Sequence, residues 1–294
     1  MRSSNPVFSR RGFSRDNGYA GFNAAPQAGG PAVGTQANPY AQQGGGNPYA
    51  QNPYAQQDLQ QGAPPQAPVT TGRMTMDDVV MRSGMTLGTV AVGAILAWAL
   101  LPVTSTSFGL AIGSALIAFV LAMVQSFKRK ASPALILGYA AFEGVFLGVI
   151  SEMYNSQWSG APFQAVLGTM AVSGATLLIY KAGWIRVTAR YARIGMAIAI
   201  AFILVMAVNL LLVAFGGAED GGLRSMGPLG AIVGIIAIIL GAFFLTLDFK
   251  QIEDGIAYGA PREEAWLAAF GLTMSIVWIY VEMLRLAAIF SGND

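Results

Sequence analysis

The sequence contains no cysteine and no histidine. Without cysteine the chain cannot form disulfides, thiolate metal sites or a thiol nucleophile. Histidine is the side chain that ordinarily gains and loses charge near neutral pH, so a response to pH in this range would have to come from carboxylates. The two absences also exclude hydrolases that need a cysteine nucleophile or a histidine base.

Charged residues are scarce as well. They make up 11% of the chain, whereas 54% of the residues are hydrophobic, and an ordinary soluble domain is about a quarter charged. This composition is typical of a membrane protein. The N-terminal region lacks the short apolar stretch and small-residue cleavage site of a signal peptide, so we expect the chain's own spans to direct its insertion.

The N-terminal part of the chain, 1–74, has a different composition from the rest. It is rich in Gly, Pro, Gln, Ala and Asn, and it repeats the pentapeptide NPYAQ at 38–42, 47–51 and 52–56. Short polar repeats cannot bury a core, so we expect a disordered tail. Two interpretations stay open: the repeated tyrosines recruit a cytoplasmic partner, or the tail is a tolerated low-complexity extension.

The folded domain is expected to span 75–294. Thr75 followed by Asp78 resembles a helix N-cap with an acidic first turn, which predicts a short helix lying at the membrane surface or running into the first span. Seven apolar runs follow, each close to the roughly 20 residues that a membrane-spanning helix needs. The sequence therefore predicts an all-α seven-helix membrane bundle with spans at about 84–103, 108–126, 133–154, 162–181, 195–215, 228–248 and 265–290.

The basic residues between the spans predict the orientation. All of them except Arg224 lie in the tail or in the second, fourth and sixth loops. Lys and Arg accumulate on the cytoplasmic side of membrane proteins. We therefore expect the N-terminus inside, the C-terminus outside, and insertion in a bacterial plasma (inner) membrane.

Small residues recur four positions apart in three of the spans. Such pairs let membrane helices approach closely, which favours a compact bundle but indicates no chemistry. The pairs are Gly109 and Gly113, Gly144 and Gly148, and Gly230 and Gly234.

Five ionisable residues lie inside the apolar runs: Glu143, Glu152, Asp248, Glu282 and Arg285. Charge in hydrocarbon costs at least about 2.5 kcal/mol, so such residues usually face the bundle interior or water and are functional candidates by default. With about 1.5 Å of rise per residue, Asp248 lies near the inner edge, Glu143 about 15 Å deep, and the other three toward the outer edge. The latter form a predicted outer polar layer.

Each candidate also has a structural interpretation. Glu282 and Arg285 are three residues apart and can neutralise each other. Glu152 can lie at the headgroup level or accept a hydrogen bond from Arg285. Asp248 can extend to water beside Lys250, whereas mid-depth Glu143 has no obvious route to water.

Three segments together resemble the Bax inhibitor-1 family of membrane proteins. GYAAFEGVFLGVISEMY at 138–154 is similar to the family's third span, where a glycine-spaced helix ends in a glutamate. LDFKQIEDG at 247–255 and GLTMSIVWIYVEMLRLAAIF at 271–290 are similar to its last two spans. The likeness covers about 75–290, and we expect the tail to be an extension outside it.

The resemblance implies six helices around a central one and a pH-sensitive calcium leak. In the family, two aspartates on the last two spans form an acidic latch near the cytoplasmic side. Asp248 matches the first and is the expected metal-binding acid, but Ser275 stands where the second often is. Glu152 matches the third-span glutamate, and Glu282 replaces what is often an amide. Without the second acid, the shared-proton mechanism of a carboxylate pair is lost.

The leading hypothesis is therefore a calcium-permeable leak channel in the lipid bilayer, with no cofactor, Asp248 and Ser275 at the gate, and Glu143 as an intramembrane carboxylate. The alternative is an interaction protein that binds a membrane protease, as some relatives do, or a cytoplasmic partner through its tail. Intramembrane aspartyl proteolysis needs two catalytic aspartates, and Asp248 stands alone in the spans. We expect neither an enzyme nor a nucleic-acid partner.

Overall fold

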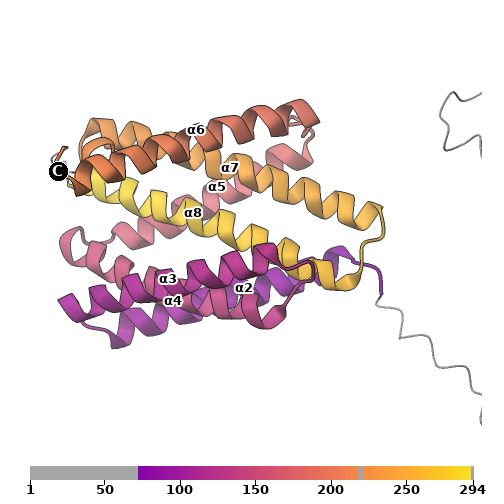
Figure 1. Cartoon of the computed structure of the whole chain (residues 1–294), viewed down its shortest axis with the longest axis horizontal. Helices are drawn as coiled ribbons and strands as arrows, with labels where there is room; N and C mark the ends of the chain where they lie inside the picture. Colours follow the sequence, from indigo (N-terminus) through magenta and orange to yellow (C-terminus); the bar gives the residue numbers. More distant parts are fainter. Residues whose placement is uncertain (1–71, 218–220, 293–294) are drawn as a thin grey trace, which may run out of the picture. The chain divides into compact units, whose positions relative to one another are not determined.

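The computed structural model describes residues 72–217 and 221–292. The rest of the predicted disordered tail, with its NPYAQ repeats, lies outside the described residues. Within them the chain forms α-helices and short 3-10 turns and no strand (Figure 1). Seven of these helices are long and apolar enough to cross a membrane. They are α2 (Met76–Leu100), α3 (Ser105–Phe127), α4 (Pro133–Gln157), α5 (Ala161–Lys181), α6 (Ala189–Ala214), α7 (Pro228–Ala257) and α8 (Ala265–Ser291).

The predicted all-α seven-span architecture is thus confirmed, and the chain is an integral multi-pass membrane protein. The helices follow the predicted spans, although α2 and α6 begin earlier and α7 continues past 248 to Ala257. Three helices carry proline in their first turn, where its missing N–H has no helical partner to lose.

The start of α2 settles the choice between a surface helix and a continuous span. Thr75 and Asp78 form a capping box, and the helix runs without a break from there to Leu100. The chain is already held before the cap, because the Met74 N–H donates to the Ala260 carbonyl and the Arg262 N–H donates to the Gly72 carbonyl, each at 2.8 Å. Gly72 and Met74 are therefore already joined to the loop at 258–264 before the helix begins.

Helix α8 is the central helix of the bundle. It packs against α2, α4, α5 and α7, and Figure 1 shows it running between α6 and α7 on one side and α2, α3 and α4 on the other. Helix α6 buries few residues and presents apolar side chains outward, as expected of a helix that faces lipid. The central helix implied by the family resemblance is therefore present, and it is the last one.

Only some of the predicted glycine pairs bring helices together. A Cβ atom on Gly144 would lie 2.5 Å from the Val90 carbonyl oxygen, and one on Gly148 would overlap the Ala94 carbonyl oxygen, so this pair lets α4 approach the α2 backbone. A Cβ atom on Gly109 or Gly113 would meet nothing within 4 Å. That pair plays no part in the packing of the described residues.

The two ends of the bundle differ in charge. We call the basic end the one formed by the start of α2 and by loops 128–132, 182–188 and 258–264, which lie together in Figure 1. It carries most of the basic residues of the described part. The opposite end is formed by loops 101–104, 158–160 and 215–227, in which Arg224 is the one basic residue of the described positions.

Candidate functional site

A polar stripe runs along α8 where it faces α7. Its members are spaced four and three residues apart, so they project from one face of the helix. Opposite them, α7 contributes one carboxylate, one backbone carbonyl that accepts a hydrogen bond, and three glycines. We call this set the α8 stripe: Gly271, Ser275, Trp278, Glu282 and Arg285.

At the basic end of the stripe, Asp248 of α7 meets Ser275 of α8. The Ser275 hydroxyl donates to Asp248 Oδ2 at 2.6 Å. The other carboxylate oxygen lies over Gly271, where a Cβ atom would be only 2.8 Å from Oδ1. The two residues singled out by the family resemblance are therefore hydrogen-bonded partners, with a glycine one turn earlier that makes room for the carboxylate.

The neighbouring charges do not reach Asp248. Lys250 pairs with Asp254 at 2.7 Å, one turn along α7, so the interpretation in which Asp248 extends outward beside Lys250 does not describe this structure. Asp248 is half-buried, and Ser275 is its hydrogen-bond partner among the described side chains.

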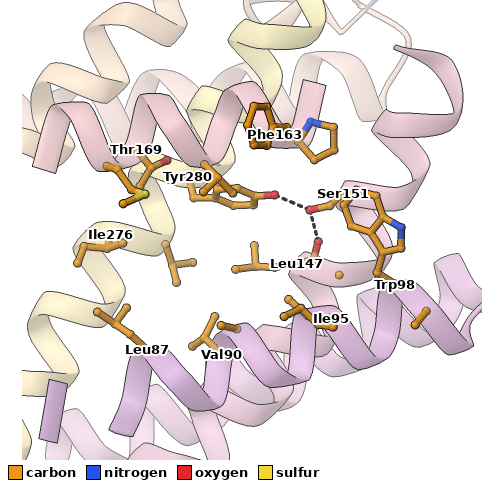
Figure 2. Close-up of a pocket in the computed structure, with 18 residues that line it drawn as sticks. Leu87, Val90, Ile95, Trp98, Leu147, Ser151, Phe163, Thr169, Ile276 and Tyr280 are labelled. Atoms are coloured by element: carbon orange, nitrogen blue, oxygen red, sulfur yellow. Dashed lines mark hydrogen bonds between the residues drawn. The ribbon is translucent and has the colours of Figure 1, made fainter. Parts of the chain in front are cut away.

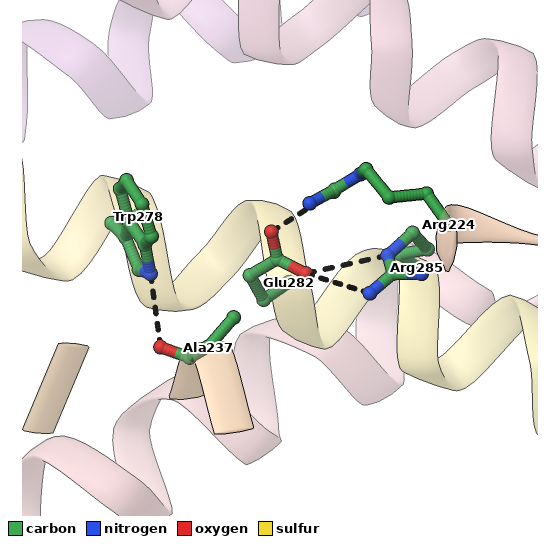
Figure 3. A network of polar contacts seen from close by, with 5 residues as sticks. All are labelled: Arg224, Ala237, Trp278, Glu282 and Arg285. Carbon is green, nitrogen blue, oxygen red and sulfur yellow. Dashed lines mark hydrogen bonds and ion pairs between the residues drawn. The ribbon is translucent and has the colours of Figure 1, made fainter. Parts of the chain in front are cut away.

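At the opposite end of the stripe, Glu282 joins two arginines (Figure 3). Its Oε1 accepts from Arg224 at 2.9 Å and its Oε2 from Arg285 at 3.1 Å. The side chains of Glu282 and Arg285 are both 6% exposed, against 35% for Arg224. The predicted Glu282 and Arg285 pair is confirmed. Arg224 was not predicted from the sequence as a partner of Glu282. Arg224 is the one basic residue of the loops opposite the basic ones, and this exception could have indicated a buried acidic partner.

Glycines on α7 accommodate this cluster. A Cβ atom on Gly234 would lie 3.0 Å from Nη2 of Arg285, and one on Gly230 would lie 3.3 Å from Nη1. Trp278 donates its indole N–H to the Ala237 carbonyl at 3.0 Å (Figure 3). The Gly230 and Gly234 pair, interpreted from sequence as a helix-packing feature without chemistry, thus makes space for a buried guanidinium group.

Glu143 lies away from the Asp248 pair. It lines a cavity of about 460 Å³ that also reaches Trp278, Glu282 and Arg224. It makes no hydrogen bond with Asp248 or Ser275 in the described part of the chain. The cavity therefore places Glu143 beside the middle and outer portion of the α8 stripe.

Glu152 does not join the outer cluster in the predicted way. Its Oε2 atom is buried without a hydrogen-bond partner among the described residues, and so is Nη1 of Arg285. The proposed hydrogen bond between Glu152 and Arg285 is therefore not formed. The outer polar layer consists instead of Glu282, Arg224 and Arg285, and in the described part of the chain Glu152 makes no hydrogen bond with them.

The described residues contain no group of three or more acids that could hold a metal ion. Asp248 with Ser275 offers a hard cation only a carboxylate and a hydroxyl, whereas stable calcium sites use six to eight oxygens. This pair alone is therefore too small a donor set for a stable calcium site.

A second polar contact holds the basic end together. Arg262 donates to Asp78 at 2.6 Å, and the Arg82 guanidinium donates to the Arg262 carbonyl and lies over the ring of Trp266. These contacts fasten the start of α2 to the loop between α7 and α8. Sequence reasoning found the Asp78 cap but not its distant partner.

Comparison with known proteins identifies the family. A family model described as Bax inhibitor 1 like matches residues 5–292. A search of curated proteins found no match. The match begins near the N-terminus and takes in most of the tail, which we had expected to lie outside the likeness. With seven apolar helices arranged around α8 and a match over nearly its whole length, the chain belongs to the Bax inhibitor 1 like family.

Proposed function

We propose that this protein is a calcium-permeable leak whose gate is the contact between Asp248 and Ser275. The observation that carries the proposal is the 2.6 Å hydrogen bond between these two side chains, which ties α7 to the central helix at the basic end. A carboxylate that is half-buried between two helices is costly to keep in an apolar region without a function.

The gate would work by exchange of partners. While Ser275 donates to Asp248, the two helices are joined and the carboxylate is covered. When α7 and α8 separate, both carboxylate oxygens become available to a hard cation, which prefers such ligands. Glu143, on the wall of its 460 Å³ cavity, offers the next acidic group deeper in the bundle.

The outer end would limit the flux. Glu282 carries one negative charge and its partners Arg224 and Arg285 carry two positive charges, which leaves a net charge of +1. A positive cluster repels an approaching cation, so we expect a slow leak and not a high-conductance channel.

The orientation and membrane belong to the proposal. The concentration of basic residues at one end of the bundle supports placing that end in the cytoplasm. Asp248 would then lie near the cytoplasmic edge of a bacterial inner membrane, and the C-terminus outside.

Calcium entry into proteoliposomes tests the proposal. The purified full-length protein is reconstituted with a trapped calcium-sensitive dye, and wild type is compared with Asp248→Asn. The control is Asp254→Asn, because Asp254 lies on the same helix in an exposed ion pair with Lys250. We expect flux in wild type and in the control and a large loss in Asp248→Asn. Flux equal to that of empty liposomes for every variant would overturn the proposal.

A regulatory role through a partner is the second candidate. The observation in its favour is that Gly72 and Met74 are hydrogen-bonded to the loop at 258–264, which follows the end of α7. Asp248 lies on the same helix, about 14 Å before that end. A membrane protease or cytoplasmic protein bound to residues before Gly72 would pull directly on that loop. Deleting 1–71 tests this, since loss of a captured partner with calcium flux unchanged would assign the regulatory function to the tail.

A further inference from the structure

A second pocket, separate from the Glu143 cavity, opens on the side of the bundle between α2, α4, α5 and α8 (Figure 2). Its volume is about 690 Å³. Its floor includes Val90 and Leu147, which are 7% and 4% exposed, whereas Ile95 and Phe163 at the mouth are 67% and 68% exposed. No charged side chain lines it.

The mouth of this pocket faces the hydrocarbon of the bilayer. It lies between the flanks of membrane-spanning helices, and the exposed residues around it are apolar. Water does not fill an apolar cavity of this kind, whereas apolar molecules do. The occupant must therefore have an apolar body and come from the membrane.

The hydroxyl groups in the pocket have already used their protons. Ser151 donates to the Leu147 carbonyl at 2.5 Å, and Thr169 donates to the Ala165 carbonyl at 2.7 Å. The Ser151 and Tyr280 hydroxyls lie 2.7 Å apart. Because a hydroxyl has one proton, Tyr280 must be the donor in that contact. The Tyr280 oxygen keeps a free lone pair, so it can accept a hydrogen bond from a ligand.

The two ends of the pocket also differ in polarity. Figure 2 shows Leu87 and Ile276 at one end and Ser151, Trp98 and Phe163 toward the other. The distance along α2 from Leu87 to Trp98 is about 16 Å at 1.5 Å per residue, or half of a hydrocarbon core of roughly 30 Å. An alkyl chain lying there would occupy one leaflet with its polar end at the Trp98 end, where tryptophan commonly marks the membrane interface.

We propose that this pocket binds a neutral amphiphile that has one alkyl chain and a hydroxyl group. The chain lies along Leu87 and Ile276, and the hydroxyl donates to the Tyr280 oxygen. The absence of charged lining residues favours a neutral head. Because the protons of Ser151, Thr169 and Tyr280 are committed, the hydroxyl cluster can only accept from a ligand, and the indole N–H of Trp98 at the rim is a donor that this contact does not use. This site is independent of calcium permeation.

Photolabelling with two matched probes tests the proposal. One probe is hexadecanol carrying a diazirine in its chain, and the other is the methyl ether of the same molecule, which has the same body but no proton to donate. The full-length protein is labelled in lipid nanodiscs, and adducts are mapped by mass spectrometry to α2 and α5. We expect the alcohol to bind about three- to tenfold more tightly than the ether, the effect of one net hydrogen bond.

Matched variants make the test specific. Tyr280→Phe should remove the preference for the alcohol, whereas Trp98→Phe, which removes a donor at the rim, should retain it. Ala91→Phe fills the pocket from an exposed lining position and should abolish labelling by both probes. Val92→Phe changes the adjacent residue, which does not line the pocket, and should leave labelling unchanged.

Two results would overturn the proposal. Equal labelling by the alcohol and the ether would mean that an ordinary acyl chain fills the groove without recognition by Tyr280. Labelling that Ala91→Phe leaves intact would mean that the probes bind elsewhere on the bundle.

Discussion

The Ser275 hydroxyl donates a 2.6 Å hydrogen bond to the carboxylate of Asp248 and so joins the last two helices of the bundle. A serine in this place changes the character of the contact. Two carboxylates would hold together by sharing a proton, whereas a hydroxyl and a carboxylate hold together with no proton gained or lost. The wild-type contact therefore does not depend on a proton shared between two carboxylates.

Ser275→Asp should give the contact a shared proton, and with it a dependence on pH that a hydroxyl partner does not supply. At about pH 6 the two carboxylates can share one proton and keep the helices joined, and at about pH 8 the loss of that proton leaves two negative charges that repel. Calcium flux in proteoliposomes should then rise more steeply with pH in the variant than in wild type. Equal pH profiles for the two proteins would contradict this account.

Gly271→Ala should disturb the same contact without altering a polar group. The added Cβ atom would lie 2.8 Å from Asp248 Oδ1, so the carboxylate must move and its hydrogen bond to Ser275 must weaken. We expect calcium flux to rise severalfold, because a weaker contact lets α7 and α8 separate and so opens the proposed gate. Gly88→Ala is the control, since a Cβ atom there meets nothing within 4 Å. A Gly271→Ala variant with wild-type flux would show that the position of Asp248 is not critical.

Glu282→Gln should destabilise the fold. It leaves the guanidinium of Arg285, whose side chain is 6% exposed, without a compensating charge. Breaking a buried pair by removing one partner costs about 3–5 kcal/mol. Arg224→Gln should cost about 1 kcal/mol or less, because Arg224 is 35% exposed and Glu282 keeps Arg285.

Unfolding in mixed detergent micelles measures both changes. Replacing Glu282 and Arg285 together by leucine is the informative companion, because removing both charges should recover much of the stability lost in Glu282→Gln. A double variant no more stable than the single one would mean that the cluster stabilises the bundle by more than charge compensation.

Asp78→Asn should loosen the basic end. Asp78 caps α2 through Thr75 and accepts from Arg262, so its loss weakens two contacts at once. Amide hydrogen exchange should accelerate at Met74 and Arg262, whose N–H groups bridge the start of α2 and the loop at 258–264. Asp77 is an exposed neighbour in the same helical turn. In the Asp77→Asn variant, amide exchange at Met74 and Arg262 should be the same as in wild type.

The sequence predicted those features that depend on local pattern. Apolar runs and flanking charges located the spans, because the bilayer requires a fixed apolar length of each. Glu282 and Arg285 could be paired from spacing alone, and Asp248 with Ser275 from the family motif. Arg224 and Arg262 could not be assigned partners, because each reaches a residue far along the chain and its position depends on how the loops fold. For the same reason, the sequence could not decide between the two interpretations of Glu152, of which the hydrogen bond to Arg285 is not formed.

The orientation of the bundle can be tested cleanly because the sequence has no cysteine. Ser159 and Ala182 lie in loops at the two ends of α5, and both are exposed. Neither is a basic residue, so replacing them by cysteine leaves unchanged the charges that direct insertion. A membrane-impermeant maleimide applied to intact cells should label Ser159→Cys and not Ala182→Cys, whereas permeabilised cells should label both. The reverse pattern would place the basic end outside, contrary to the positive-inside rule. Asp248 would then face the exterior, and its proposed gate would respond to the external medium and not to the cytoplasm.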